Sequence, residues 1–144
     1  MKTVSVHIVT YNSEPFIQAC IEAVLQQTYP IERIIVIDNQ SKDRTREVLD
    51  RFNTIEVIYN ERNNGFAGGH NQAIRLSNSD YCLILNPDVV LAPEYVERMV
   101  SFAANHPEAG GFTGKLISAA SPEKIDSTGI TINKSRRAFD RGGN

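Results

Sequence analysis

One acidic side chain stands in a proline turn at residues 85–88, which read Leu-Asn-Pro-Asp. The turn follows a strand-like apolar segment, so the Asp88 carboxylate is expected at the end of a strand. Hard cations such as Mg²⁺ or Mn²⁺ take oxygen ligands, and one or two protein carboxylates suffice when a diphosphate supplies the rest. The same pattern also suits a plain turn in which Asp88 caps the next helix. Both roles stay open for Asp88 on these residues alone.

Polar side chains also follow the first two strand-like segments. Thr10, Tyr11 and Asn12 come after the first, and Asp38 comes after the second. A carboxylate at a strand end can accept hydrogen bonds from a nucleobase imide or a ribose hydroxyl, while an Asx turn or a helix cap is the structural alternative. Tyr11 can stack on a planar base with its hydroxyl in water, or cover the start of the first helix.

A glycine-bearing segment at residues 63–71 reads Asn-Asn-Gly-Phe-Ala-Gly-Gly-His-Asn. We expect a loop up to residue 69 and a helix over residues 70–76. Its glycines permit close backbone approach to a ligand, and free N–H groups at a helix start favour an anion. A flexible connection would look the same, and His70 has no His or Ser partner in a recognisable arrangement.

The elements that must position these residues alternate between strand and helix. Apolar, β-branched runs predict strands over residues 4–10, 33–38, 55–59 and 81–85. Amphipathic spacing predicts helices after a Ser13 cap, around Val48 to Phe52, and over residues 93–105. Looser strands are expected over residues 110–117 and 125–132. The order indicates an α/β fold with a mainly parallel sheet and helices on both faces, whose ligands bind at the carboxyl ends of the strands.

Composition narrows the class of protein. The chain has 144 residues, 41% of them hydrophobic and 22% charged, with a net charge of −2, so we expect a globular domain that binds no nucleic acid. Cys20 and Cys82 lie in apolar segments and are expected to be free, buried thiols of a reducing compartment. A signal peptide and a run of ~20 apolar residues are both missing, so a cytoplasmic protein is expected.

Four motifs together resemble a known family. In order they are Val-Thr-Tyr-Asn at 9–12, Val-Ile-Asp-Asn at 36–39, the glycine-bearing segment at 63–71, and Leu-Asn-Pro-Asp at 85–88. This series is similar to inverting family-2 glycosyltransferases, and within them to the bacterial rhamnosyltransferase-like branch. The resemblance covers nearly the whole chain, and four ordered motifs are far more specific than any one of them.

The resemblance implies a GT-A fold that binds a nucleotide-sugar donor, with dTDP-rhamnose first and UDP-sugars next. Tyr11 and Asp38 would contact the base, with Thr10 and Asn12 nearby. The donor would also meet a further set of side chains: Asn64, Gly65, Gly68, His70, Asn71 and Asn86. Asp88 would bind Mg²⁺ or Mn²⁺, although Asn86 replaces the first acid of the family's Asp-x-Asp motif.

The resemblance also implies what this chain lacks. The family's general base lies in a later acidic motif, and no Glu-Asp or Asp-Asp pair follows residue 108 here. We therefore expect one nucleotide-sugar-binding domain over residues 1–144, C-terminally truncated, with residues 110–144 beginning the acceptor side. Such a chain would bind donor but transfer poorly. The acceptor implied is a glycan or lipid-linked saccharide, met by a full-length protein peripheral to the inner face of the cell membrane.

Three competing functions make different demands on the sequence. A nucleotidyltransferase usually carries a basic glycine-rich loop after the first strand, where this chain has residues 11–14, Tyr-Asn-Ser-Glu. A dinucleotide-binding oxidoreductase needs GxGxxG in the first turn, which is missing. A non-catalytic nucleotide-sugar-binding module needs only the same binding residues, so it stays open.

Overall fold

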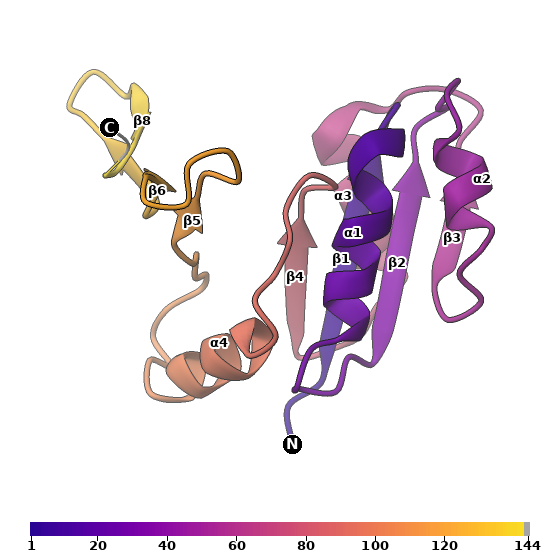
Figure 1. The fold of residues 1–144 in the computed structure, drawn as a ribbon. Helices are drawn as coiled ribbons and strands as arrows, with labels where there is room; N and C mark the ends of the chain where they lie inside the picture. Colours follow the sequence, from indigo (N-terminus) through magenta and orange to yellow (C-terminus); the bar gives the residue numbers. More distant parts are fainter. Residues whose placement is uncertain (143–144) are drawn as a thin grey trace. The chain divides into compact units, whose positions relative to one another are not determined.

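Four parallel strands form the central sheet of the protein (Figure 1). The structure is a computed structural model that describes residues 1–142; Gly143 and Asn144 lie outside the described residues. The strands lie in the order β3-β2-β1-β4, with bounds β1 Val4–Thr10, β2 Arg33–Asp38, β3 Glu56–Tyr59 and β4 Tyr81–Leu85. Their carboxyl ends share one edge of the sheet, as the α/β pattern predicted.

Burial follows the position of each strand in the sheet. Every residue of β1 is buried, and β2 is buried from Ile34 onwards, because neighbours on both sides and helices on both faces exclude water. β4 lies at an edge and alternates between covered and exposed side chains. The expectation that both thiols are buried is therefore wrong for Cys82, which is exposed, whereas Cys20 is buried; both cysteines are free, as predicted.

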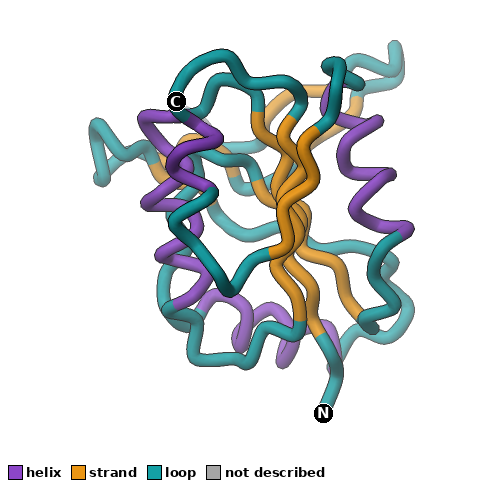
Figure 2. The backbone as a smooth tube through the Cα atoms, turned by 90° about the vertical axis from the view of Figure 1, so that its right-hand side faces the viewer, coloured by secondary structure: helices purple, strands orange, loops and turns teal. Residues whose placement is uncertain are grey.

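Helices cover both faces of the sheet, as predicted (Figure 2). α1 (Glu14–Leu25) and α2 (Thr45–Leu49) pack on one face, where Ile17, Ile21 and Leu49 join the larger core cluster. α3 (Gly65–Arg75) covers the other face, where Ala73 packs with β1 and β2. Ser13 stands at the N-cap position of α1, as predicted, but its side chain does not cap the helix: the Ser13 hydroxyl accepts a hydrogen bond from the Tyr11 N–H at 3.4 Å and forms none with the first turn of α1.

The chain divides into two compact units, Met1–Arg98 and Met99–Asn144. α4 (Tyr95–Ala104) spans the division, and two antiparallel hairpins follow: β5 (Leu116–Ile117) with β6 (Ile125–Ser127), and β7 (Ile130–Ile132) with β8 (Ala138–Asp140). The single strand expected over residues 125–132 is wrong: it is two strands, β6 and β7, because Gly129 between them has a φ of +127°. The strand expected over residues 110–117 shrinks to its last two residues. Among the described residues, no helix is long and apolar enough to cross a membrane.

Asp80 ties the first residues of the chain to the start of β4. Its carboxylate accepts hydrogen bonds from Lys2 Nζ at 2.7 Å and from the Thr3 N–H at 2.8 Å. These bonds, that of Lys2 first, lower the pKa of Asp80 from 3.8 to about 2. Because the folded pKa is depressed, the stabilisation is complete above the unfolded pKa and is lost as the pH falls through the folded one.

Replacing Asp80 with asparagine is therefore expected to change how stability depends on pH. The free energy of unfolding of the unaltered chain should exceed that of Asp80→Asn near neutral pH. The two values should converge as the pH falls from about 4 to about 2, because protonation removes the same ion pair from the unaltered chain. Urea unfolding across this range measures the difference. A difference that stays constant down to about pH 2 would contradict the assignment.

Candidate functional site

The sheet brings the first two predicted motifs side by side at its carboxyl edge. Thr10, the last residue of β1, pairs in register with Asp38, the last residue of β2, and Asp38 pairs with Tyr59 of β3. The Leu-Asn-Pro-Asp turn follows β4, whose Leu85 pairs with Ile8 of β1. The strand-end residues singled out from the sequence thus lie at one edge of one sheet.

Asp38 lies under the surface of this edge. Its side chain is fully buried, and each carboxylate oxygen has protein partners. Thr10 Oγ1 donates to Oδ1 at 3.2 Å, and the Ser41 N–H lies 3.2–3.3 Å from both oxygens. Arg46 Nε donates to Oδ2 at 2.7 Å. A direct bond from this carboxylate to a nucleobase would need one of these partners to move.

Arg46 was not singled out by the sequence, although it covers Asp38. It comes from α2, eight residues after the carboxylate that it pairs with. Its guanidinium lies 5.0 Å from the centre of the Tyr59 ring, and Nη2 donates to the main-chain oxygen of Asn60 at 3.4 Å. The Arg46 side chain is 40% exposed, whereas that of Asp38 is 0% exposed. The sequence shows only a cation in the first turn of the helix that follows Asp38.

Asn12 joins the loop after β1 to the loop after β2. Its φ of +52° is one that asparagine tolerates better than most residues. Its N–H donates to Ser41 Oγ at 2.9 Å, and its Oδ1 accepts from the Lys42 N–H at 2.8 Å. The side-chain oxygen of Asn12 therefore holds the two loops together, and its place beside the base stays a prediction.

A second set of hydrogen bonds connects β2 and β3 to the start of α3. Asn39 is 1% exposed, and its Nδ2 donates to the Gly65 carbonyl at 3.0 Å. Asn60 Nδ2 donates to Asn39 Oδ1 at 2.9 Å and to Gln72 Oε1 at 3.0 Å. Buried amide networks of this kind fix geometry because each unpaired polar group would be costly. Asn39 and Asn60 thus set where α3 begins relative to the strand ends.

The glycine-bearing segment is the start of a helix, and the loop expected up to residue 69 is wrong. α3 begins at Gly65, whose φ is +72°, directly after Asn64. Gly69 lies against β1: a Cβ placed on it would stand 2.8 Å from both methyl carbons of Val9. Gly68 meets only the Cβ of Asn64, at 3.1 Å. Two of the glycines therefore serve the start of α3 and its close packing on the sheet.

His70 lies beneath the surface of α3. It is 5% exposed, and among the described residues neither ring nitrogen has a hydrogen-bond partner. Phe66, 58% exposed, covers it edge-on with the ring centres 4.3 Å apart. Burial, with a smaller contribution from His7, lowers the pKa of His70 to about 4, so its ring is neutral at pH 7. Asn71, the next residue, is exposed.

Tyr11, Asn86 and Asp88 also face solvent, and their side-chain polar groups form no hydrogen bond among the described residues. Tyr11 is 49% exposed, and both residues of the β4 turn are exposed. Within residues 1–142 the Asp88 carboxylate accepts no hydrogen bond and forms no ion pair. The turn itself is held from below, where Cys20 Sγ lies 3.6 Å from the Asn86 carbonyl oxygen. Burial, with a contribution from the charge of Asp88, raises the pKa of the Cys20 thiol to about 12.

These residues fit a cation only with help from a ligand. No group of three His, Cys, Asp or Glu side chains in the described part of the chain could hold a metal ion. Asp88 offers one carboxylate, and Asn86 offers one amide oxygen. Mg²⁺ and Mn²⁺ suit such an oxygen-poor site when phosphate oxygens and water complete the shell. The donor set therefore fits a cation that arrives together with a diphosphate.

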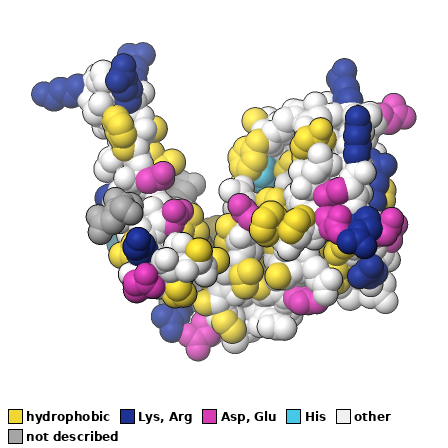
Figure 3. All heavy atoms as spheres, turned by 45° about the horizontal axis from the view of Figure 1, so that its top comes forward, with side chains coloured by type: hydrophobic (Ala, Val, Ile, Leu, Met, Phe, Trp, Pro, Cys, Tyr) yellow, Lys and Arg dark blue, Asp and Glu magenta, His cyan; other side chains and the backbone are white. Residues whose placement is uncertain are grey.

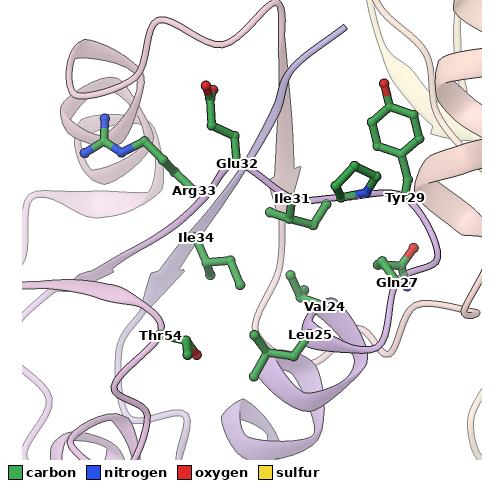
Figure 4. A pocket seen from close by; sticks show the side chains of 10 residues that line it. Val24, Leu25, Gln27, Tyr29, Ile31, Glu32, Arg33, Ile34 and Thr54 are labelled. Atoms are coloured by element: carbon green, nitrogen blue, oxygen red, sulfur yellow. The ribbon is translucent and has the colours of Figure 1, made fainter. Parts of the chain in front are cut away.

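Figure 3 brings the carboxyl edge of the sheet forward and shows hydrophobic side chains around a histidine, with acidic side chains nearby. The pocket in Figure 4, of about 280 Å³, lies elsewhere, at the amino end of β2. It is lined by the end of α1, the segment that leads into β2, and the loop before β3: Val24, Leu25, Tyr29, Ile31, Ile34 and Thr54. The candidate site is thus an open surface, distinct from this pocket.

Comparison with protein families gives one match, and it spans most of the chain. Residues 5–135 match the family described as Glycosyl transferase family 2. The chain belongs to glycosyltransferase family 2. The match includes all four motifs of the candidate site and extends into the second unit. The assignment to family 2 is therefore confirmed, and the rhamnosyltransferase-like branch stays a prediction.

One curated relative illustrates the family. The chain is 32% identical over 100 residues to the Escherichia coli UDP-Glc:alpha-D-GlcNAc-diphosphoundecaprenol beta-1,3-glucosyltransferase WfgD, covering 68% of this chain and 40% of that protein. The chain spans half or less of the length of the curated relatives it matches first. The activity of the whole protein is therefore a matter for proposal.

Solved structures confirm the fold class. The mannosyltransferase PcManGT from Pyrobaculum calidifontis, in complex with GDP-Man and Mn²⁺, superposes with a TM-score of 0.68 at 23% identity, over 72% of this chain and 32% of that one. S. aureus TarS in complex with UDP-GlcNAc superposes with a TM-score of 0.66 at 24% identity, over 73% and 32%. This family-2 chain therefore has the GT-A-like α/β fold that the motifs implied.

Proposed function

We propose that this family-2 chain forms the donor-nucleotide half of a glycosyltransferase that uses a nucleoside-diphosphate sugar. One observation carries the proposal most directly. Asp88 presents a free, exposed carboxylate on the same sheet edge as the exposed Tyr11 ring and the start of α3. The Tyr11 ring can stack on a base, the start of α3 can bind a diphosphate, and the Asp88 carboxylate can bind a cation.

Each group has a role set by its chemistry. The exposed Tyr11 ring stacks on the base, and the first N–H groups of α3, beginning at Gly65, face the phosphates. Asp88 and the amide oxygen of Asn86 bind the cation. Mg²⁺ or Mn²⁺ held there supplies Lewis-acid stabilisation of negative charge on the leaving diphosphate. Asp38 and Thr10 do not contact the donor in this proposal; their hydrogen bond fixes the ends of β1 and β2 beneath the site.

The proposed reaction is a single, inverting displacement at the anomeric carbon of the donor sugar. A carboxylate general base would deprotonate the acceptor hydroxyl. We place that base outside this chain, because Asp126 and Asp140 are isolated acids with no acidic neighbour. The donor is proposed to be dTDP-rhamnose or a UDP-sugar. The acceptor is proposed to be a glycan or lipid-linked saccharide, met at the inner face of the cell membrane by the full-length protein.

Titration calorimetry of the chain with UDP, dTDP, GDP and NAD, each with and without Mn²⁺, tests the proposal. We expect at least one nucleoside diphosphate to bind, and its affinity to rise by about tenfold or more with Mn²⁺, since Asp88 would hold the cation and the cation would offset the negative charge of the diphosphate. NAD is expected not to bind. Binding of NAD alone, or of none of the four ligands, would refute the proposed function.

A further inference from the structure

The polar surface over the end of β2 is formed by a cation, although the sequence suggested an acid. Each carboxylate oxygen of Asp38 already accepts hydrogen bonds from two protein donors: Thr10 and Ser41 on Oδ1, and Ser41 and Arg46 on Oδ2. The Arg46 side chain lies over it and is the exposed member of the pair, at 40% against 0%. A ligand that approaches this strand end meets N–H donors before it meets the carboxylate.

The guanidinium of Arg46 is held in place before any ligand arrives. Its Nε is fixed by Asp38 at 2.7 Å, and its plane is supported by the Tyr59 ring at 5.0 Å. Tyr59 is held in turn by a hydrogen bond from its hydroxyl to Asp50. Of the terminal nitrogens, Nη2 reaches only the Asn60 carbonyl, at 3.4 Å, and Nη1 has no acceptor among residues 1–142. Fixed, unused donors of this kind are what a recognition site requires.

The position of Arg46 limits what it can contact. Both of its anchors, Asp38 and Asn60, stand at carboxyl ends of strands, on the side of the site bounded by β2 and β3. The cation ligand Asp88 follows β4, the strand at the opposite edge of the sheet. A nucleotide whose diphosphate lies near Asp88 therefore extends its base toward β2 and Arg46.

We propose that Arg46 determines base specificity, by donating a hydrogen bond to the exocyclic carbonyl oxygen of a keto base. That oxygen is O4 of uracil or thymine, or O6 of guanine. Cytosine and adenine carry an amino group at the same place, whose hydrogens would meet the guanidinium donor to donor. This proposal rests on the proposed nucleotide site, and adds that Arg46 selects the base and that the base is of the keto class.

Two matched nucleotide pairs test the proposal: UDP against CDP, and IDP against ADP. The members of each pair exchange a carbonyl oxygen for an amino group at one ring position. Calorimetry with saturating Mn²⁺ gives the ratio of dissociation constants within each pair. We expect the unaltered chain to prefer the keto member by about tenfold in the pair that it binds, and Arg46→Met to bring that ratio close to one.

The ratio is insensitive to partial unfolding, because both ligands sample the same folded fraction. This matters since Arg46→Met leaves the Asp38 charge buried without its partner. The double variant Asp38→Asn with Arg46→Met removes the pair together and is expected to show the same loss of selectivity. Arg44→Met is the matched control, because Arg44 carries the same charge two residues before Arg46 but pairs with Glu14. It should leave the ratio unchanged.

The other outcomes separate the two proposals. If Arg46→Met weakens both members of a pair equally, Arg46 contacts a phosphate or acts only through charge, and the base selector is refuted while the nucleotide site stands. A ratio near one in the unaltered chain refutes the selector in the same way. If no nucleoside diphosphate binds to any variant, the proposed function itself fails.

Discussion

Replacing Asp88 with asparagine is expected to abolish the Mn²⁺ dependence of nucleoside diphosphate binding. Asp88 is the one carboxylate offered by the β4 turn, and the described residues contain no cluster that could hold the ion without it. An amide keeps the size of the side chain but removes the charge that attracts a hard cation. The affinity measured with Mn²⁺ should fall by the whole Mn²⁺ enhancement, about tenfold or more, equivalent to about 1.4 kcal/mol or more, whereas the affinity without metal should hardly change. Paired calorimetric titrations with and without Mn²⁺ measure both values.

Two further variants sharpen that experiment. Asn86→Asp supplies a second carboxylate to the same turn, so Mn²⁺-dependent affinity should rise. Asp126→Asn removes the same charge from an exposed position in the second unit and should leave the Mn²⁺ dependence intact. If Asp88→Asn keeps the full response to Mn²⁺, the cation is bound by other groups and the assignment of Asp88 is wrong.

Asp38 is buried and Asp88 is exposed because the strands that they follow occupy different positions in the sheet. Asp38 ends β2, a strand with neighbours on both sides, and its carboxylate is used to join β1, the loop after β2, and α2. Asp88 follows β4, an edge strand, and nothing in residues 1–142 competes for its oxygens. The same residue type therefore serves structure at one strand end and is available for a ligand at the other.

The sheet could be predicted from the sequence because its signal is local. Residues 4–10 are mostly apolar and residues 34–37 are continuously apolar, which is the pattern expected of strands buried on both faces. The Cys82 error has the same origin: an apolar run does not reveal that its strand lies at an edge. Edge position is set by strand order, which depends on contacts between distant segments.

The residues missed at the site are those whose roles come from tertiary contacts. Arg46 stands on an ordinary helix face, and only the fold reveals that Asp38 lies beneath it. Asn39 and Asn60 follow strand ends in the sequence, but only the fold reveals that their amides connect to each other and to the start of α3. The start of α3 was itself misplaced, because three glycines within five residues usually indicate a loop. Here two of them serve the beginning of the helix and its approach to β1.

Gly69→Ala is expected to destabilise the chain, although alanine is the better helix former by about 1 kcal/mol. The added Cβ would stand 2.8 Å from both methyl carbons of Val9, whose β-branched side chain has little freedom to rotate inside the sheet. Overpacking of this kind costs about 1–3 kcal/mol, so the clash should outweigh the gain in helix propensity. Urea unfolding measures the net change.

Two controls separate the clash from every other effect of the substitution. Gly68→Ala makes the same chemical change one residue earlier, where the neighbour is Asn64 at the exposed start of the helix. The Gly68→Ala variant should therefore be more stable than Gly69→Ala by about 2 kcal/mol. Val9→Ala creates space beneath Gly69, so the double variant should be more stable than the two single changes predict by about 1–2 kcal/mol. Strict additivity would mean that α3 does not lie as close to β1 as the structure shows. Because the first N–H groups of α3 are proposed to face the phosphates, the spacing set by Gly69 and Val9 also fixes how far that helix start stands from Asp88's edge of the sheet.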